Sequence, residues 1–444
     1  MLSAFTTTIV NPGHPDYDTL RMSWNVAVDQ RPALIARPTD VAGVGAAIAV
    51  ARERGLRVTL RGGGHNPAPL GDLSDTLLLR TDAMQGVTID ADRRIARVQG
   101  GALWDHVVPE AALHGLYPLH GSSPDVGVVG YSLSGGLGWV ARRYGLQANR
   151  IVAAEVVLAS GHFVRTDAEH EPELLWALRG GGGSFAAVVA LEFELLPLTH
   201  AYAGWLAWDW THSERVLNRW VEWAAEAPDA VTSAARILQL PDLPTIPEPL
   251  RGRNLVAIDG AVLDERRDLL APLRDLRPEL DTFATLPAAA LSRLHADPEG
   301  PTPAVSASAM LGALDEDAVS AFVGAAGPGS GSTLVASELR QLGGAVGRRA
   351  RGGGALTHLD GEFLLYGVAI AATPALGAAG HVSAQRLAHA MAPWAGGRAY
   401  GNFVEERTDP ARFYDAATYA KLQVIKDVLD PAGVFRANHD VRGR

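Results

Sequence analysis

The sequence of 444 residues contains no cysteine. This absence excludes disulfide bonds, thiolate metal sites, iron–sulfur clusters, catalytic thiols and a thioether link to a cofactor. The chain also lacks an apolar run approaching the roughly 18 residues that a membrane-spanning helix needs. We therefore expect no membrane partner, and the length allows two or three domains with sizeable cores.

Positive charges are outnumbered by negative ones. The sequence has 39 Lys and Arg residues against 49 Asp and Glu residues, a formal net charge of -10. Such a chain repels polyanions, so nucleic acid is not an expected partner. Residues 1–18 show neither the basic leader nor the apolar run of a signal peptide, which predicts a cytoplasmic protein. His106, His114 and His120 lack a grouping typical of metal ligands, so no metal is predicted.

Glycine is abundant, and many of the 48 glycines gather in tight clusters between regular elements. The surrounding pattern predicts an α+β fold. Residues 33–37 form an apolar strand, Asp40 stands at a helix N-cap position, and Gly55 ends the helix that follows. Residues 57–61 alternate like a strand. Further strands are expected at 76–80, 87–90, 95–98, 151–159, 162–165 and 186–196, and a short helix at 171–178.

The pattern changes near residue 198, where we expect a domain boundary. The glycine clusters stop there, and Trp205, Trp208 and Trp210 follow in quick succession. We interpret these tryptophans as strand or core residues, with a carbohydrate platform as the alternative. Beyond them the sequence predicts a proline-rich loop at 241–249, a strand at 363–371 and a helix at 419–429.

The first glycine cluster is Arg61-Gly62-Gly63-Gly64-His65-Asn66, at the end of a predicted strand. Three glycines let backbone N–H groups approach a flat ring or a pyrophosphate without interference from side chains. His65 would then face the bound group from a tightly held loop. An ordinary glycine-rich turn with a surface histidine is the alternative.

Two more clusters follow, at 121–139 and 179–185. The second cluster lacks the Gly-Lys-Ser/Thr ending of a P-loop and the GxGxxG order of a Rossmann turn, which argues against ATP hydrolysis. The third cluster precedes a predicted strand. By itself it is also consistent with a helix stop and a flexible loop.

Four sequence blocks together resemble the PCMH-type FAD-binding domain of the vanillyl-alcohol oxidase superfamily, most closely that of the berberine bridge enzyme-like oxidases. The blocks are RPALIARPTDVAGVGAAIAVARERGLRVTLRGGGHN (31–66), GSSPDVGVVGYSLSGGLGWVARRYGL (121–146), EVVLASGHFVRTDAEHEPELLWALRGGGGSF (155–185), and YGNF with LQVIKDVLDPAGVF (400–403 and 422–435). The resemblance implies an FAD-binding domain over 1–198, a substrate domain with an antiparallel sheet covered by helices over 199–385, and a C-terminal segment over 386–444 that completes the FAD domain.

The resemblance further implies that FAD is bound covalently, through a bond from His65 to the 8α carbon of the flavin. A neutral imidazole nitrogen is a nucleophile, which makes such a bond chemically reasonable. Some relatives add a second bond from a cysteine, but Ser123 takes the matching position here, so His65 is the only expected link. The other implied cofactor-binding residues are Arg61, Gly62, Gly63, Gly64, Asn66, Ser123, Val126, Gly127, Ser132, Gly135, Gly136, Gly138, Val157 and Asn402.

Tyr400 begins a sequence similar to the family's Tyr-x-Asn-aromatic motif, and the resemblance implies that it acts as the general base. Its pKa of about 10 would have to fall through a neighbouring cation, a second phenol or the field of the reduced flavin. Tyr366 and Glu362 are expected to support it, because they share one face of a predicted strand at 362–371. An exposed or core-edge strand position is the alternative for both.

The resemblance implies an FAD-linked oxidase that acts on a small organic substrate, such as an alcohol, sugar, amine or natural-product intermediate, and reduces O2 to H2O2. Val126 matches a position at which a valine admits oxygen to the reduced flavin in plant relatives. The alternatives are a flavin-dependent monooxygenase or an oxidative cyclase of secondary metabolism, and, further from the pattern, a non-redox nucleotide-binding module. The sequence leaves the substrate, the physiological electron acceptor and the oligomeric state open.

Overall fold

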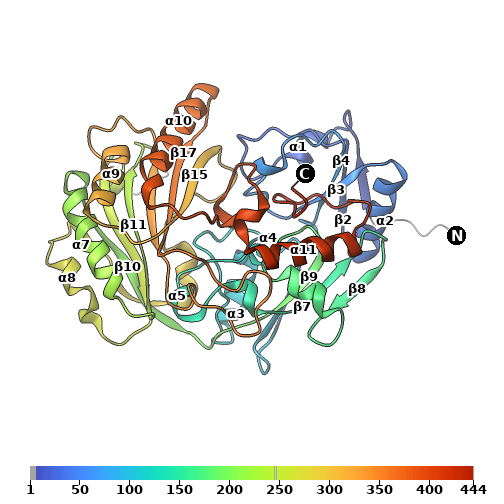
Figure 1. Ribbon diagram of the computed structural model, residues 1–444, viewed down its shortest axis with the longest axis horizontal. Coiled ribbons are helices and arrows are strands. Elements are labelled where there is room, and N and C mark those ends of the chain that lie inside the picture. The colour runs from blue at the N-terminus through green and yellow to red at the C-terminus, as the bar shows by residue number, and fades with distance from the viewer. Residues whose placement is uncertain (1–6, 245, 247, 444) are drawn as a thin grey trace.

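The structure is a computed structural model that describes residues 7–244, 246 and 248–443. Residues 1–6, which belong to the segment in which we expect no signal peptide, lie outside this description, as do residues 245 and 247 of the predicted proline-rich loop. The described residues form three β-sheets with helices packed against them (Figure 1). Within the described residues, no helix combines the length and the apolar composition needed to cross a membrane.

The first sheet contains the strand that leads into the first glycine cluster. Its order is β1 (Thr7–Val10), β2 (Leu34–Pro38), β4 (Thr76–Arg80), β3 (Arg57–Arg61). Strands β2 and β3 both run parallel to β4, and α2 (Val41–Glu53) connects them. Asp40 caps this helix as predicted, because its carboxylate accepts a hydrogen bond from the Gly43 amide at 2.7 Å. The short helix α1 (Tyr17–Arg21) lies between β1 and β2 in the chain.

The second sheet is antiparallel and has five strands. Its order is β5 (Val87–Asp90), β6 (Ile95–Gln99), β9 (Ala187–Glu194), β7 (Ile151–Val157), β8 (Phe163–Thr166). The predicted strand at 151–159 ends two residues early, because Leu158 already belongs to the turn and its amide bonds to the His162 carbonyl. The helices that contact this sheet are α3 (Trp104–Ala112), α4 (Val128–Leu133) and α6 (Pro172–Leu178), whereas α5 (Ala141–Tyr144) contacts β11 (Val231–Gln239) of the third sheet.

The third sheet is the largest and is antiparallel throughout. Its order is β13 (Leu280–Asp281), β10 (His200–Asp209), β12 (Asn254–Val262), β11 (Val231–Gln239), β16 (Ala336–Gln341), β17 (Phe363–Ile370), β15 (Ala304–Leu311), with β14 (Ala284–Pro287) also paired to β10. The mixed helix and strand content is that of the predicted α+β class. The domain boundaries near residues 198 and 385 stay predictions.

One face of the large sheet is apolar and covered by helices. Ile237 on β11 and Leu339 on β16 belong to a buried core. The helices that complete this core are α7 (Ser213–Glu226), α9 (Glu316–Ala326) and α10 (Pro374–Ala390), and Figure 1 shows them along the outer side of the sheet. A further short helix, α8 (Ala271–Arg274), contacts α7.

The opposite face of the same strands carries polar and charged side chains. Successive side chains on a strand point to opposite faces. Because Ile237 and Leu339 point into the core, their neighbours Arg236, Glu338 and Arg340 point to the opposite face. In the sheet register Glu338 pairs with Arg236 on one side and with Tyr366 on the other. This row of side chains faces the part of the molecule that contains the glycine clusters.

The C-terminal segment returns to the first two sheets. Helix α11 (Ala416–Leu429) contributes Leu422 and Ile425 to the core of the second sheet. The chain after α11 then runs beside β3, where the Val58 amide bonds to the Val434 carbonyl at 2.7 Å. The C-terminal segment thus packs against both the first and the second sheet.

Lys426 fastens this segment from inside. Its ammonium group is buried and donates to the Ser184 carbonyl at 2.5 Å, to the Asp430 carboxylate at 2.7 Å and to the Phe435 carbonyl at 3.0 Å. Asp430 also accepts from the Val434 and Phe435 amides at 2.8 Å each. Every donor of the ammonium group therefore has an acceptor, which is the condition for tolerating a buried charge.

We predict that Lys426→Met lowers the free energy of unfolding by about 3 to 5 kcal/mol, because it leaves the Asp430 carboxylate buried without its cation. Urea denaturation of the purified protein measures the change. Lys421→Met on the same helix is the control: Lys421 pairs with Glu173 at the surface, and exposed pairs contribute about 0 to 1 kcal/mol. Equal losses in the two variants would contradict the assignment.

Candidate active site

The first glycine cluster forms the loop that follows β3. Gly64 has a φ of +87°, and a Cβ there would lie 3.1 Å from the Arg61 side chain and from Ser23. Only glycine adopts this conformation without strain in so tight a space. Arg61 is buried and donates to the Gln30 side chain at 2.5 Å and to the Arg21 carbonyl at 2.6 Å, which holds the base of the loop.

His65 lies on this loop, where Trp24 covers one face of its ring and Asp125 lies at the ring edge. The Trp24 ring stacks on the imidazole with centroids 4.1 Å apart. The Nε2 atom lies 3.1 Å from the Asp125 carbonyl oxygen and 3.4 Å from the Asp125 carboxylate. Partial burial opposes ionisation of Asp125, but hydrogen bonds from His65, the Gly300 amide and Trp24 hold the pKa of this carboxyl well below its usual range.

The second glycine cluster packs against the first. A Cβ at Gly63 would lie 3.4 Å from the Gly127 amide nitrogen, and Gly127 is the N-cap of α4. Beyond α4, Gly135 and Gly136 have φ values of +129° and +81°. A Cβ at Gly138 would lie 1.9 Å from the His120 carbonyl oxygen, so no side chain fits there. The two clusters therefore meet through backbone at Gly63 and Gly127, and the glycines that follow α4 allow close packing of the surrounding chain.

The remaining residues predicted to bind the cofactor surround these two clusters. Ser123 donates to the Asp125 carboxylate at 2.9 Å. Val126 is partly buried beside the core of the second sheet, and Val157 is buried in the core of the first sheet. The third glycine cluster lies apart from them: Gly180 has a φ of +106°, and a Cβ there would lie 2.2 Å from the Leu356 side chain, so its role is tight backbone packing.

The C-terminal motif meets both glycine clusters. Asn402 donates to the Tyr131 carbonyl at 3.1 Å, and Asn66 donates to the Val404 carbonyl at 2.9 Å. Tyr400 is buried against Gly135, where a Cβ would lie 2.9 Å from the phenol oxygen. Residues more than 250 positions apart in the sequence are thereby brought together, as the resemblance implied.

Buried polar atoms in this region support a polar ligand. The side-chain carbonyl oxygens of Asn66 and Asn402 and the hydroxyl of Ser132 are buried and have no hydrogen-bond partner among the described residues. Buried polar groups are nearly always hydrogen-bonded in folded proteins. Together with the bare glycine backbone, these atoms fit a flat ring that carries carbonyl and N–H groups, as FAD does.

Arg340 is the cation near Tyr400, and the sequence reasoning missed it. Its guanidinium carbon lies 5.3 Å from the Phe403 ring centroid and 5.7 Å from that of Trp139. Burial raises the pKa of Tyr400 above its ordinary value, and the Gly136 amide and the positive charge of Arg340 offset only part of this rise. A usable signal was the alternation of Glu338 and Arg340 with apolar Leu339 on a strand.

Glu405 is a second residue that the sequence reasoning missed. The Tyr366 hydroxyl donates to the Glu405 carboxyl at 3.1 Å, and the Tyr366 ring packs edge-on to Phe403. Burial raises the pKa of Glu405, while its hydrogen bonds with Ser306 and Tyr366 and the charge of His65 act in the opposite direction. Burial, with the nearby Glu405, also raises the pKa of Tyr366.

The expectation for Glu362 is corrected by the structure. Strand β17 begins at Phe363, and Glu362 precedes it with an exposed side chain at the end of the sheet. Tyr366 lies inside the strand and is directed at Glu405 instead. The alternation of side chains predicted the strand correctly. Alternation does not show at which residue a strand starts or whether its first residues are exposed to solvent.

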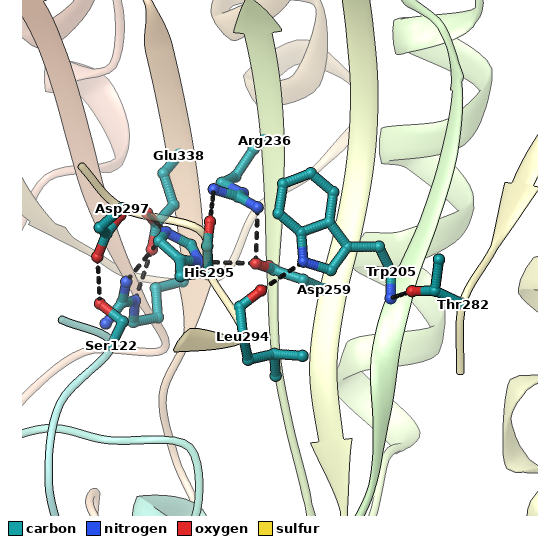
Figure 2. A network of polar contacts seen from close by, with 10 residues as sticks. Ser122, Trp205, Arg236, Asp259, Thr282, Leu294, His295, Asp297 and Glu338 are labelled. Carbon is teal, nitrogen blue, oxygen red and sulfur yellow. Dashed lines mark hydrogen bonds and ion pairs between the residues drawn. The ribbon is translucent and has the colours of Figure 1, made fainter. Parts of the chain in front are cut away.

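A network of buried charges holds Arg340 in place, and Figure 2 labels its members Glu338, His295, Asp259 and Arg236. Arg340 donates to Glu338 at 2.5 Å, and the other carboxylate oxygen of Glu338 lies 2.9 Å from Nε2 of His295. On its other side, Nδ1 of His295 lies 2.6 Å from Asp259, which also pairs with Arg236 at 2.8 Å. All five side chains are buried.

The network extends from the sheet to its surroundings. Arg236 stacks over the Trp205 ring at 4.3 Å, so this tryptophan is a packing residue of the sheet. Asp297 accepts a hydrogen bond from Ser122 of the second glycine cluster at 2.8 Å, and Figure 2 shows this link beside Glu338. The network thus connects the polar face of the large sheet with the glycine clusters.

His295 is the titratable centre of this network. Burial and Arg236 oppose its protonation, but the carboxylates of Asp259, Glu338 and Asp297 outweigh them and raise the pKa of His295 to about 9. Glu338 has the opposite behaviour: despite burial, Arg340 and His295 hold the pKa of Glu338 far below its ordinary value. The protonated imidazole therefore bridges two carboxylates.

Residues 32–167 match the family model described as FAD binding domain. The chain contains an FAD-binding domain. Its match includes His65 and the first two glycine clusters, which meet through backbone at Gly63 and Gly127. FAD is therefore the cofactor, as the resemblance implied.

Known proteins resemble the chain beyond this domain. A curated relative, (R)-6-hydroxynicotine oxidase of Paenarthrobacter nicotinovorans, is 33% identical over 201 residues, which are 45% of this chain and 44% of that protein. The chain thus matches about half the length of such relatives. Wild-type BBE-like 1 of Physcomitrella patens has a TM-score of 0.86 at 19% identity, over 99% of this chain and 98% of that one.

A third similar structure is glucooligosaccharide oxidase of Acremonium strictum, described with a 6-S-cysteinyl, 8α-N1-histidyl FAD. It has a TM-score of 0.82 at 22% identity and covers 98% of this chain and 97% of that one. Identities this low show the fold alone. The comparisons confirm the resemblance to berberine bridge enzyme-like, PCMH-type oxidases and the predicted fold class, while the roles of single residues stay predictions.

The raised pKa of His295 predicts a pH dependence of stability. A group whose pKa is higher in the folded state than in the unfolded state stabilises the fold fully below the unfolded pKa, about 6.5, and loses that contribution as pH rises through the folded pKa, here about 9. We expect the unfolding free energy of the wild type to fall across this window by up to about 1.4 kcal/mol per pH unit relative to His295→Gln.

Denaturant titrations of both proteins between pH 6 and pH 10 measure this difference. The variant should be the less stable protein at pH 6, and the gap between the two should narrow toward pH 10. Parallel stability curves across the whole range would show that folding does not raise the pKa of His295.

Proposed function

We propose that the protein is an FAD-linked oxidase that takes a hydride from a small organic substrate and passes the electrons to O2, with formation of H2O2. The observation that carries the proposal is the convergence at Tyr400: the second glycine cluster contacts its phenol, and a held cation, Arg340, lies over the Phe403 ring that stacks on Tyr400. The curated relative and one of the similar structures named above, glucooligosaccharide oxidase, are oxidases, which supports the same reaction type.

FAD supplies the hydride acceptor, and the residues of this chain would bind it and handle the proton. The backbone of the two glycine clusters would lie against the ring, and Asn66, Ser132 and Asn402 offer it hydrogen-bonding atoms. His65 would be the only covalent link, because Ser123 cannot replace a cysteine and the chain contains none.

Tyr400 would accept the proton of the substrate hydroxyl or amine as the hydride leaves. Taking this proton avoids a cationic product. Burial by itself favours the neutral phenol and so opposes a base, but the positive charge of Arg340 favours the phenolate. Glu338 and His295 fix the guanidinium in position, so its effect on Tyr400 does not require rearrangement.

The substrate would lie between the polar face of the large sheet and the glycine clusters. Beside Tyr400, a cavity is lined by Ser306, Ser308 and Glu405, among others. Hydroxyl and carboxyl groups suit a substrate with hydroxyl or amine groups. A small alcohol, sugar or amine is the substrate class that we propose, and the cytoplasmic location stays a prediction.

The first test is the cofactor and the fate of oxygen. We expect purified protein to be yellow, to retain its colour after acid precipitation, and to carry the mass of one FAD. With a panel of alcohols, sugars and amines, an active substrate should yield about one H2O2 per O2 consumed. Incorporation of an oxygen atom from labelled O2 into the product would favour the monooxygenase alternative, and protein without flavin would contradict the proposal.

The second test concerns the proton. Tyr400→Phe should slow flavin reduction at saturating substrate by about a hundredfold or more, which is the usual contribution of a positioned acid or base, and should remove one ionisation from its pH profile. Arg340→Met should shift that ionisation to higher pH, because the phenolate loses its cation. Stopped-flow absorbance of the flavin measures both.

Tyr366→Phe is the matched control for removing a phenol from the same site, and its effect should be smaller. Wild-type rates in Tyr400→Phe at every pH would place the base elsewhere. Glu405→Gln would then be the next variant, in place of the Glu362 change that the sequence pattern favoured.

A further inference from the structure

Asp125 connects the residues around His65, because both of its carboxylate oxygens accept hydrogen bonds. One carboxylate oxygen accepts from the Trp24 indole at 2.6 Å and from the Gly300 amide at 2.8 Å. The other accepts from Ser123 at 2.9 Å and lies 3.4 Å from Nε2 of His65. The proposed function uses His65 but assigns no role to this carboxylate.

The contacts of His65 determine which ring nitrogen carries the hydrogen. Nε2 lies 3.1 Å from the backbone carbonyl oxygen of Asp125 as well as near its carboxylate. A carbonyl oxygen and an ionised carboxylate can only accept hydrogen bonds, so Nε2 carries the hydrogen in the neutral imidazole. Nδ1 is then the nitrogen with the free lone pair. The Trp24 ring, stacked at an interplanar angle of 19°, fixes the plane in which this lone pair points.

We propose that Asp125 is the residue that prepares His65 for covalent attachment of FAD, by orienting the imidazole with Nδ1 free and by accepting its Nε2 proton as the bond forms. This inference rests on the proposed link between His65 and FAD. It assigns a function to a residue that the resemblance did not mark.

Covalent attachment releases two protons and transfers two electrons to molecular oxygen. The 8-methyl group of oxidised FAD loses one proton, and Nδ1 of His65 forms a bond to that carbon while an electron pair enters the ring system. The imidazole gives its Nε2 proton to the Asp125 carboxylate, which leaves a neutral, substituted imidazole. Molecular oxygen then takes two electrons from the reduced ring and, with two protons, becomes hydrogen peroxide. Asp125 gives its proton to solvent, which regenerates the carboxylate. The two protons lost in the attachment equal the two that hydrogen peroxide takes up.

Glu405 is the other carboxyl group whose charge interaction reaches His65. It accepts a hydrogen bond from Tyr366, and burial raises its pKa, which favours its neutral form. Asp125 instead directly contacts Nε2 and is held ionised by three donors besides His65. The geometry therefore favours Asp125 as the proton acceptor.

The experiment measures covalent attachment rather than turnover. Protein expressed under riboflavin limitation is incubated with excess FAD in air, and intact mass follows the gain of one covalently bound FAD with time. Asp125→Asn keeps the size of the side chain and an acceptor oxygen but cannot take a proton. We expect it to bind FAD and to attach it about a hundredfold more slowly than the wild type.

Two controls separate this role from a structural one. Asp105→Asn removes an exposed carboxylate close to Asp125, since the Asp105 amide bonds to the Pro124 carbonyl at 2.8 Å, and Glu405→Gln removes the other nearby carboxylate; both should attach FAD within about threefold of the wild-type rate. If either slows attachment as much as Asp125→Asn, or if Asp125→Asn reacts at the wild-type rate, the assignment to Asp125 is overturned.

A further pair of measurements covers a misfolded variant and a failed premise. If Asp125→Asn does not fold, Asp125→Ala is tested with added formate, which should restore attachment by supplying a carboxylate; a folded variant that formate does not accelerate would contradict the proposal. If wild-type protein binds FAD but never gains its mass, the link through His65 is wrong, a failure distinct from that of Asp125. His65→Ala defines the baseline without attachment.

Discussion

The ion pair between Arg340 and Glu338 is the interaction on which the candidate site depends. A cation buried beside aromatic rings is costly unless its charge and its donors are matched. Glu338 supplies that match at 2.5 Å, and His295, Asp259 and Arg236 extend it across three strands and a loop. With His295 protonated, these five groups carry three positive and two negative charges. Asp297 adds a further negative charge that acts on both His295 and Arg340.

The network is possible because the sheet has two different faces. Leu339 and Ile237 point into the core under α7, α9 and α10, so their neighbours on the strands must point the other way. A purely apolar second face would pack at lower cost in free energy. The charges on this face therefore indicate a functional constraint, and they bring β11, β12 and β16 into contact with residues of the second glycine cluster through Asp297 and Ser122.

Glycine has a complementary role on the opposite side of the site. At Gly135 and Gly138 a Cβ would overlap Tyr400 and the His120 carbonyl, so these positions allow close packing of the surrounding chain. The C-terminal segment reaches this region because Lys426 and Asp430 anchor it in the first two sheets. The position of Tyr400 is thus determined by contacts on three sides: glycine backbone, the Phe403 ring and the buried cation beyond it.

Local elements could be read from the sequence alone, and its motifs named the residues that we propose for the cofactor region. Asp40 predicts its helix start and Arg57–Arg61 its strand because capping and alternation are local properties. The glycine clusters, His65 and Tyr400 could be named from motifs, since bare backbone and specific side chains leave a recognisable order. Glu362 was misplaced because alternation does not reveal where a strand emerges into solvent. The alternation around Leu339 marks a charged face of a strand, but the roles of Arg340, Glu405, His295 and Asp125 come from partners more than 35 residues away. Only the tertiary structure showed them, because a local pattern does not encode which charges will be buried together.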